Sequence, residues 1–65
     1  MTVKVRQFTY AAEELVEAIE YMKNDIEYLE RQLSKYIDNP FVFEGVSKNI
    51  EYDKKLLEEL EQAQA

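Results

Sequence analysis

The sequence predicts an all-α fold, an antiparallel helical hairpin preceded by an extended N-terminal arm. Apolar residues recur at alternating spacings of three and four through the first half of the chain, and this spacing resumes after the sequence Asp38-Asn39-Pro40. Such a period places an apolar stripe on each of two helices, and each stripe must be covered by another helix. The first stripe comprises Val5, Phe8, Ala12, Leu15, Ile19, Met22, Ile26, Leu29, Leu33 and Tyr36.

Residues 1–9 are expected to form the extended arm. The segment is rich in β-branched and aromatic residues with partial alternation, which favours a strand over a helix. An isolated strand is unstable, so an ordered arm must pair with a second copy or lie along the helices, and otherwise it is a mobile tail. Thr9 is a suitable N-cap, so the first helix is expected to begin near Tyr10.

The first helix is predicted over residues 10–37 and the turn over residues 38–40. No helix-breaking residue occurs between Ala11 and Ile37. Proline cannot continue a helix and disfavours α geometry at the residue before it, yet it suits the first turn of a new helix. The turn is therefore expected to be tight.

Two starting points are possible for the second helix. In one, Phe41-Val42-Phe43 is an extended linker and Ser47 caps a helix that follows Gly45. In the other, the helix begins at Pro40 and tolerates Gly45 at a cost of about 1 kcal/mol relative to alanine. The apolar spacing favours the second, with a helix over residues 40–61, because it continues without a skip through Phe43, Val46, Ile50, Asp53, Leu57 and Leu60.

Packing the two stripes together predicts further association. Antiparallel pairing brings Leu60 near Leu15 and leaves Val5 and Phe8 beyond the end of the second helix. Flanking apolar residues such as Val16 would stay wet in a monomer, whereas a homodimer forming a four-helix bundle would cover them. Chains of this size rarely gain enough stability from a single core. The 65 residues are therefore expected to form one helical-hairpin domain that dimerises.

Asp53 is the one charged position in the stripes. Under the predicted register Lys23 is its nearest possible partner, and a polar contact of that kind could fix the register of the helices. The alternative is a small rotation of the helix that places Asp53 at the wet margin, because burying an unpaired charge is costly.

Composition excludes several classes of function. Cysteine and histidine are absent, so nucleophilic catalysis, acid–base catalysis and the usual metal sites lack their common residues, and neither enzyme activity nor a cofactor or metal is expected. The net charge of −6 disfavours direct nucleic-acid binding. No apolar run is long enough for a membrane span and no signal peptide is recognisable, so a cytoplasmic protein is expected.

Two groups of residues are candidate contacts for a partner. Tyr21 and Tyr28 lie one heptad apart outside the main stripe, either covering the flank of the bundle or forming an aromatic docking patch. The partner-binding candidates are Val5, Phe8, Tyr10, Val16, Tyr21 and Tyr28, and the candidates for an acidic face are Glu13, Glu17, Glu20 and Asp25.

These features predict a small acidic interaction protein that regulates or inhibits a larger protein partner. In size, charge and architecture the chain is similar to small regulators made by bacteria and their phages. One alternative is a homo-oligomeric structural module, whose architecture resembles the RNA-binding helical-hairpin dimer of plasmid copy control, although the acidic surface disfavours RNA. The other is an acidic mimic of nucleic acid that blocks a DNA-binding protein.

Overall fold

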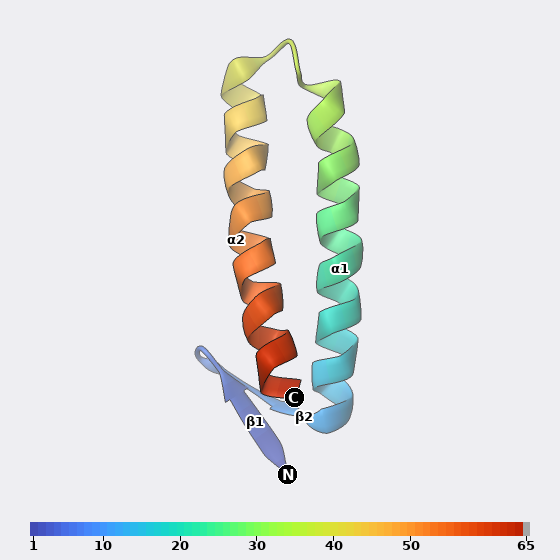
Figure 1. Cartoon of the computed structure of the whole chain (residues 1–65), viewed down its shortest axis with the longest axis vertical. Helices are drawn as coiled ribbons and strands as arrows, with labels where there is room; N and C mark the ends of the chain where they lie inside the picture. The colour runs from blue at the N-terminus through green and yellow to red at the C-terminus, as the bar shows by residue number, and fades with distance from the viewer. Residues whose placement is uncertain (65) are drawn as a thin grey trace.

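The protein, in a computed structural model that describes residues 1–64, is a rod of 47 × 18 × 15 Å. Strands β1 (Thr2–Val5) and β2 (Phe8–Ala11) precede helices α1 (Ala12–Lys35) and α2 (Pro40–Gln64). The helices lie antiparallel, and both strands and both chain ends lie at one end of the rod (Figure 1). We call this end the base and the end with the interhelical turn the tip. The predicted helical hairpin is confirmed, but the molecule is not all-α.

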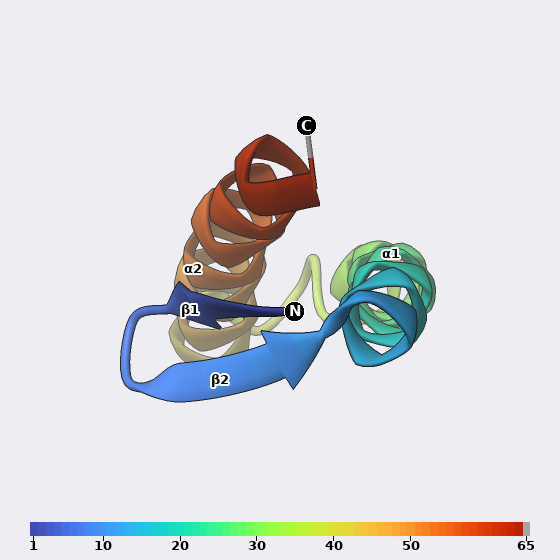
Figure 2. The ribbon, with the colours of Figure 1, turned by 90° about the horizontal axis from the view of Figure 1, so that it is seen from below.

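The N-terminal arm pairs with itself. β1 and β2 form an antiparallel pair in which Thr2 is opposite Ala11 and Val5 is opposite Phe8. The two residues between them make the turn, and Arg6 has a φ of 58°, in the left-handed region that tight hairpin turns require. Seen from below, the strands span the space between the ends of the two helices (Figure 2). The arm is extended as predicted, but its pairing partner belongs to the same chain.

The first helix begins later than predicted. Thr9 lies within β2, so its expected role as an N-cap was wrong. Ala11 is the N-cap, and its backbone N–H donates to Glu14 Oε1 at 2.9 Å. Alanine has no side-chain acceptor to complete a capping box, so Glu14 supplies half of that motif. Its carboxylate also lies near the positive end of the helix dipole.

The second helix begins at Pro40, as the continuous apolar spacing predicted. Asn39 caps it, because its Oδ1 accepts a hydrogen bond from the Val42 N–H at 3.3 Å. The helix passes through Gly45 without a break and continues to Gln64, beyond the predicted end at residue 61. The first helix ends at Lys35, so the connection is a turn over residues 36–39.

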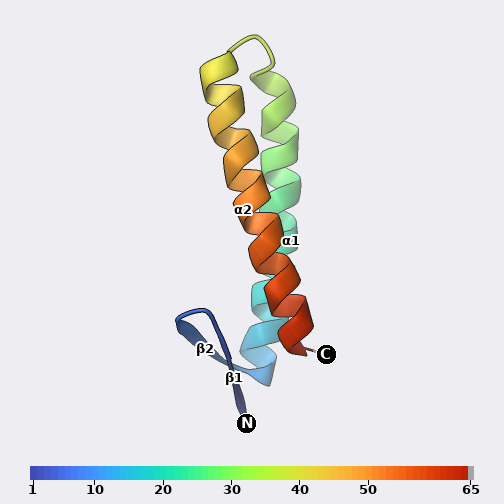
Figure 3. The ribbon, with the colours of Figure 1, turned by 60° about the vertical axis from the view of Figure 1, so that its left-hand side comes forward.

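The most tightly packed part of the core lies at the base. Val5 from β1, Leu15 and Ile19 from α1, and Leu60 from α2 form one buried cluster. Further along the rod, Ile26 and Ile50 are buried between the helices. The proximity of Leu60 to Leu15 agrees with the prediction, whereas the overhang of Val5 was wrong. The reason is that α2 continues to Gln64 and that Val5 of the strand pair packs in one cluster with Leu60 of α2. The side view shows both strands at the base of the helix pair (Figure 3).

On one flank of the helix pair, two ion pairs connect α1 with α2. Lys23 of α1 lies 3.8 Å from Glu61 of α2, and Glu30 lies 3.3 Å from Lys54. Lys23 and Glu30 are a heptad apart, so they share one side of α1. We call this side the charged flank. No helix within residues 1–64 has the length and apolar character needed to cross a membrane.

Asp53 occupies a different environment from either prediction. Its side chain is buried, with 8% of the residue exposed, so the wet-margin alternative was wrong. Lys23 is bound to Glu61 on the charged flank, so the predicted contact of Asp53 with Lys23 was wrong as well. Asp53 instead faces Asp25 of α1. Positions 23 and 25 lie about 200° apart around a helix axis, which puts Asp25 on the flank opposite Lys23.

Candidate interaction surfaces

Tyr21 and Tyr28 form an exposed aromatic pair on α1, which we call the tyrosine stripe. They are 71% and 57% exposed, although tyrosine carries a large apolar ring. Ala18 and Asp25, on the same side of the helix, are half-buried. The two rings therefore extend outward past the interface between the helices. Exposed tyrosines on a rigid helix are suited to anchoring a protein partner, because aromatic residues are enriched at binding hot spots.

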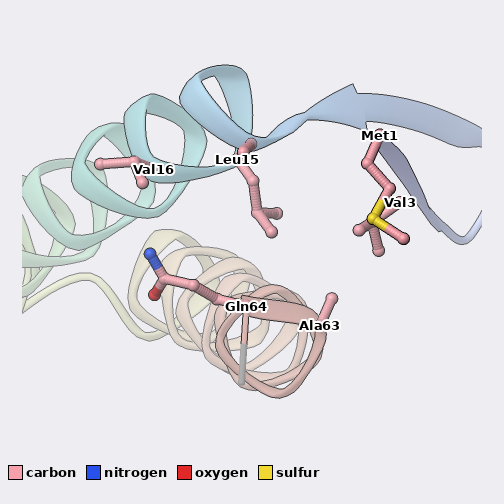
Figure 4. Close-up of a pocket in the computed structure, with 7 residues that line it drawn as sticks. Met1, Val3, Leu15, Val16, Ala63 and Gln64 are labelled. Carbon is pink, nitrogen blue, oxygen red and sulfur yellow. The ribbon is translucent and has the colours of Figure 1, made fainter.

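An apolar hollow of about 230 Å³ opens at the base. It lies between β1, the first turns of α1 and the end of α2 (Figure 4). Its lining is almost entirely apolar, and at its edge Met1 is fully exposed and Val16 is half-exposed. A hollow of this size and character fits an apolar side chain from another molecule. Its lining residues are Met1, Val3, Ala12, Leu15, Val16, Ala63 and Gln64.

A second hollow, of about 260 Å³, lies between the strand pair and α2. Phe8, Tyr10 and Tyr52 contribute aromatic rings to it. The guanidinium of Arg6 lies 5.0 Å from the centre of the Tyr52 ring, within range of a cation–π interaction. The presence of Arg6 in the wall of this hollow gives it a mixed polar and apolar character.

Arg6 fastens the strand pair to α2. Its Nε and Nη2 donate hydrogen bonds of 3.0 and 2.8 Å to the two carboxylate oxygens of Glu59. These hydrogen bonds lower the pKa of Glu59 and raise the pKa of Arg6, because each charge stabilises the other. The bidentate geometry fixes the orientation of the turn. We call this contact the arginine clamp, and it pairs the Arg6 guanidinium with a carboxylate of the same chain.

The predicted partner contacts are divided by the fold. Val5 is buried in the core cluster and is not exposed to a partner in this structure, and Tyr10 is half-buried against the same cluster. The strand pair accounts for both, because it turns one face toward α2. The four candidates that are exposed are Phe8, Val16, Tyr21 and Tyr28.

The four residues of the predicted acidic face also differ in their exposure. Glu13, Glu17 and Glu20 are exposed on α1, and none makes an ion pair with another residue of the described chain. Asp25 is half-buried, and its position on α1 places it on another side of the helix from the three exposed glutamates. The remaining three glutamates form an unneutralised negative patch on the N-terminal half of α1.

Two exposed apolar residues at the tip were not among the candidates. Ile37 and Phe41 flank the turn and are 71% and 88% exposed. Both lie next to the Asp38-Asn39-Pro40 sequence, and Phe41 lies outside the apolar spacing of the second helix. That departure from the spacing was the available signal, because an apolar residue outside the stripe has no facing helix to cover it.

No group of three or more histidine, cysteine, aspartate or glutamate side chains within residues 1–64 is placed to hold a metal ion. Comparison of the chain with protein-family models, with curated proteins and with solved structures finds no match.

Proposed function

We propose that the protein is a non-enzymatic binding protein of the cytoplasm that regulates or inhibits a larger protein partner. The tyrosine stripe is the proposed contact surface. The observation that carries this proposal is the exposure of Tyr21 and Tyr28, which lie one heptad apart on a continuous helix.

The energetics of such a contact support the proposal. Burying one tyrosine ring on a partner contributes on the order of a few kcal/mol from apolar area alone. Both rings are carried by α1, which is already ordered along Ala12–Lys35, so little backbone entropy is lost on binding. The pair can therefore supply a compact hot spot from a small protein.

Self-association is a second candidate, favoured by the apolar hollow at the base. Val16 is 47% exposed beside it, and a second copy that covers this region would form the homodimeric four-helix bundle predicted by the sequence. Mimicry of nucleic acid is a third, favoured by the unpaired Glu13, Glu17 and Glu20. These candidates predict different dependence on salt and on substitution.

The deciding experiment is an affinity pull-down from the source cell with the tagged chain, followed by native mass spectrometry. The test variant is Tyr21→Ser/Tyr28→Ser. Phe41→Ser is the matched control, because it removes an aromatic ring of even greater exposure from the tip. We expect the double variant to keep its helical circular dichroism and lose the partner, while the control retains it. A partner that binds the double variant as well as the wild type would contradict the proposal.

Salt and charge separate the remaining candidates. A nucleic-acid mimic should lose its partner as salt is raised and in a variant that replaces Glu13, Glu17 and Glu20 with glutamine. A structural module should appear in the mass spectrum as a dimer with no other protein bound. Binding through the tyrosine stripe should persist in moderate salt, because it depends on apolar contact.

A further inference from the structure

Asp53 of α2 is buried at the helix interface, where Asp25 of α1 is the charged group that influences it. Asp53 is more than nine-tenths buried, and its Oδ2 is inaccessible to solvent and has no hydrogen-bond partner among the described residues. Asp25, half-buried on α1, is the group that acts on it. Two carboxylates can only accept hydrogen bonds, so in the ionised state they repel each other and leave that oxygen unsatisfied.

The basic side chains on the neighbouring elements form ion pairs with glutamates and not with Asp53. Lys54, next to Asp53 in sequence, is paired with Glu30 at 3.3 Å on the charged flank. Lys23 is paired with Glu61 on the same flank. On the strand pair, Arg6 is held by Glu59 in the arginine clamp. Asp25 is the only titratable group on the facing helix that perturbs Asp53 within the described chain.

A single proton shared by the two carboxyl groups removes both the repulsion between them and the unsatisfied hydrogen-bonding position. With a proton on Oδ2, Asp53 becomes a hydrogen-bond donor, and an oxygen of the Asp25 carboxylate becomes its acceptor. The buried oxygen is then satisfied, and the interface carries one negative charge in place of two. We propose that Asp25 and Asp53 share one proton at the α1–α2 interface, so that the contact between the two helices strengthens as the surroundings become more acidic.

The electrostatics of the pair act in the same direction. Burial first, and then the hydrogen bond and negative charge of Asp25, raise the pKa of Asp53 above its ordinary value. A carboxyl group with a higher pKa in the folded state contributes its full stability below the unfolded pKa, about 3.9 for aspartate. This contribution is lost as the pH rises through the folded pKa. Binding of a proton to Asp53 therefore stabilises the interface between α1 and α2, whether or not a protein partner is bound.

Titration of the full chain by carbon-13 NMR, following the side-chain carboxyl carbons of the aspartates, tests this directly. We expect the side-chain carboxyl carbon of Asp53 to titrate above the range of ordinary aspartates. Asp38, exposed in the turn, is the internal reference in the same spectra. An ordinary titration of Asp53, near pH 4, would overturn the proposal.

Thermal unfolding as a function of pH provides the second test. The melting temperature of the wild type, measured relative to that of Asp53→Asn, should fall between pH 4 and pH 7, because the asparagine amide donates a hydrogen bond at every pH. Asp38→Asn is the matched control and should keep the pH profile of the wild type. A constant difference between wild type and Asp53→Asn across this range would contradict the shared proton. If Asp53→Asn fails to fold, the wild-type titration decides alone.

Discussion

The base and the tip of the rod are built from the same two helices, yet they hide very different amounts of apolar surface. At the base, Val5, Leu15 and Leu60 are buried in one cluster, whereas Ile37 and Phe41 at the tip stand in solvent. The difference is the strand pair, which adds a third layer over the ends of the helices (Figure 2). Two helices cover only one stripe of each other, so burial of a complete cluster requires an additional element.

Leu60→Ala should have the largest effect on stability. Leu60 is 1% exposed at the centre of the base, and removing a buried leucine side chain costs about 2 to 5 kcal/mol, including the cavity left behind. Leu33→Ala, half-buried toward the tip, is the matched control and should cost less. Urea unfolding followed by circular dichroism measures both. Equal losses of unfolding free energy in the two variants would contradict the proposal that the base is more tightly packed than the tip.

Val5→Ala tests whether the strand pair contributes to the core. Fully burying a valine is worth about 1.5 to 3 kcal/mol, and the alanine variant should lose much of this. Val16→Ala makes the same chemical change at a half-exposed position of α1 and should lose less. The comparison is made by thermal unfolding. If Val16→Ala is the more destabilising variant, the strand pair does not act as a third layer.

Glu59→Gln should weaken the base in a pH-dependent manner. The arginine clamp lowers the pKa of Glu59, so its contribution is present above the ordinary glutamate pKa and is lost as the pH falls through the folded value. The wild type should melt above Glu59→Gln at pH 7, and the two should converge on acidification. Glu58→Gln, an exposed neighbour with the same change in charge, is the control. A difference that grows toward low pH would contradict this assignment.

Phe41→Ser should have the smallest effect. Phe41 is 88% exposed, and substitutions at such surface positions usually change stability by less than about 0.5 kcal/mol. The measurement is the midpoint of urea unfolding. Phe43→Ser, at a half-buried position two residues further along α2, is the more damaging comparison. A loss from Phe41→Ser as large as that from Leu33→Ala would mean that the tip is covered in solution.

The sequence predicted the helix pair and its turn but not the strand pair. The apolar spacing and the Asn39-Pro40 sequence determine local helix geometry, so these elements were readable. The hairpin turn at Arg6 and Gln7 lacks the Asn-Gly or Asp-Gly pattern that marks such turns. Its stability comes from contacts with Glu59 and Tyr52, which are distant in sequence and therefore leave no local signal.

For the candidate surfaces, the sequence predicted which side chains of a single helix are exposed, but not how neighbouring elements pack against each other. Exposure of Tyr21 and Tyr28 follows from their position outside the stripe, which is a property of one helix alone. The fates of Val5, Asp25 and Asp53 depend on which flank faces the neighbouring element. That choice is made by packing between elements, and periodicity within one helix does not contain it.

The arginine clamp joins residues that are 53 positions apart in a chain of 65. The turn at the tip involves only neighbours, so folding should begin there and proceed toward the base, with the strand pair docking last. During synthesis from the N-terminus, Val5 and Leu15 remain uncovered until Leu60 has emerged. Completion of the core is therefore tied to the synthesis of α2 as far as Leu60.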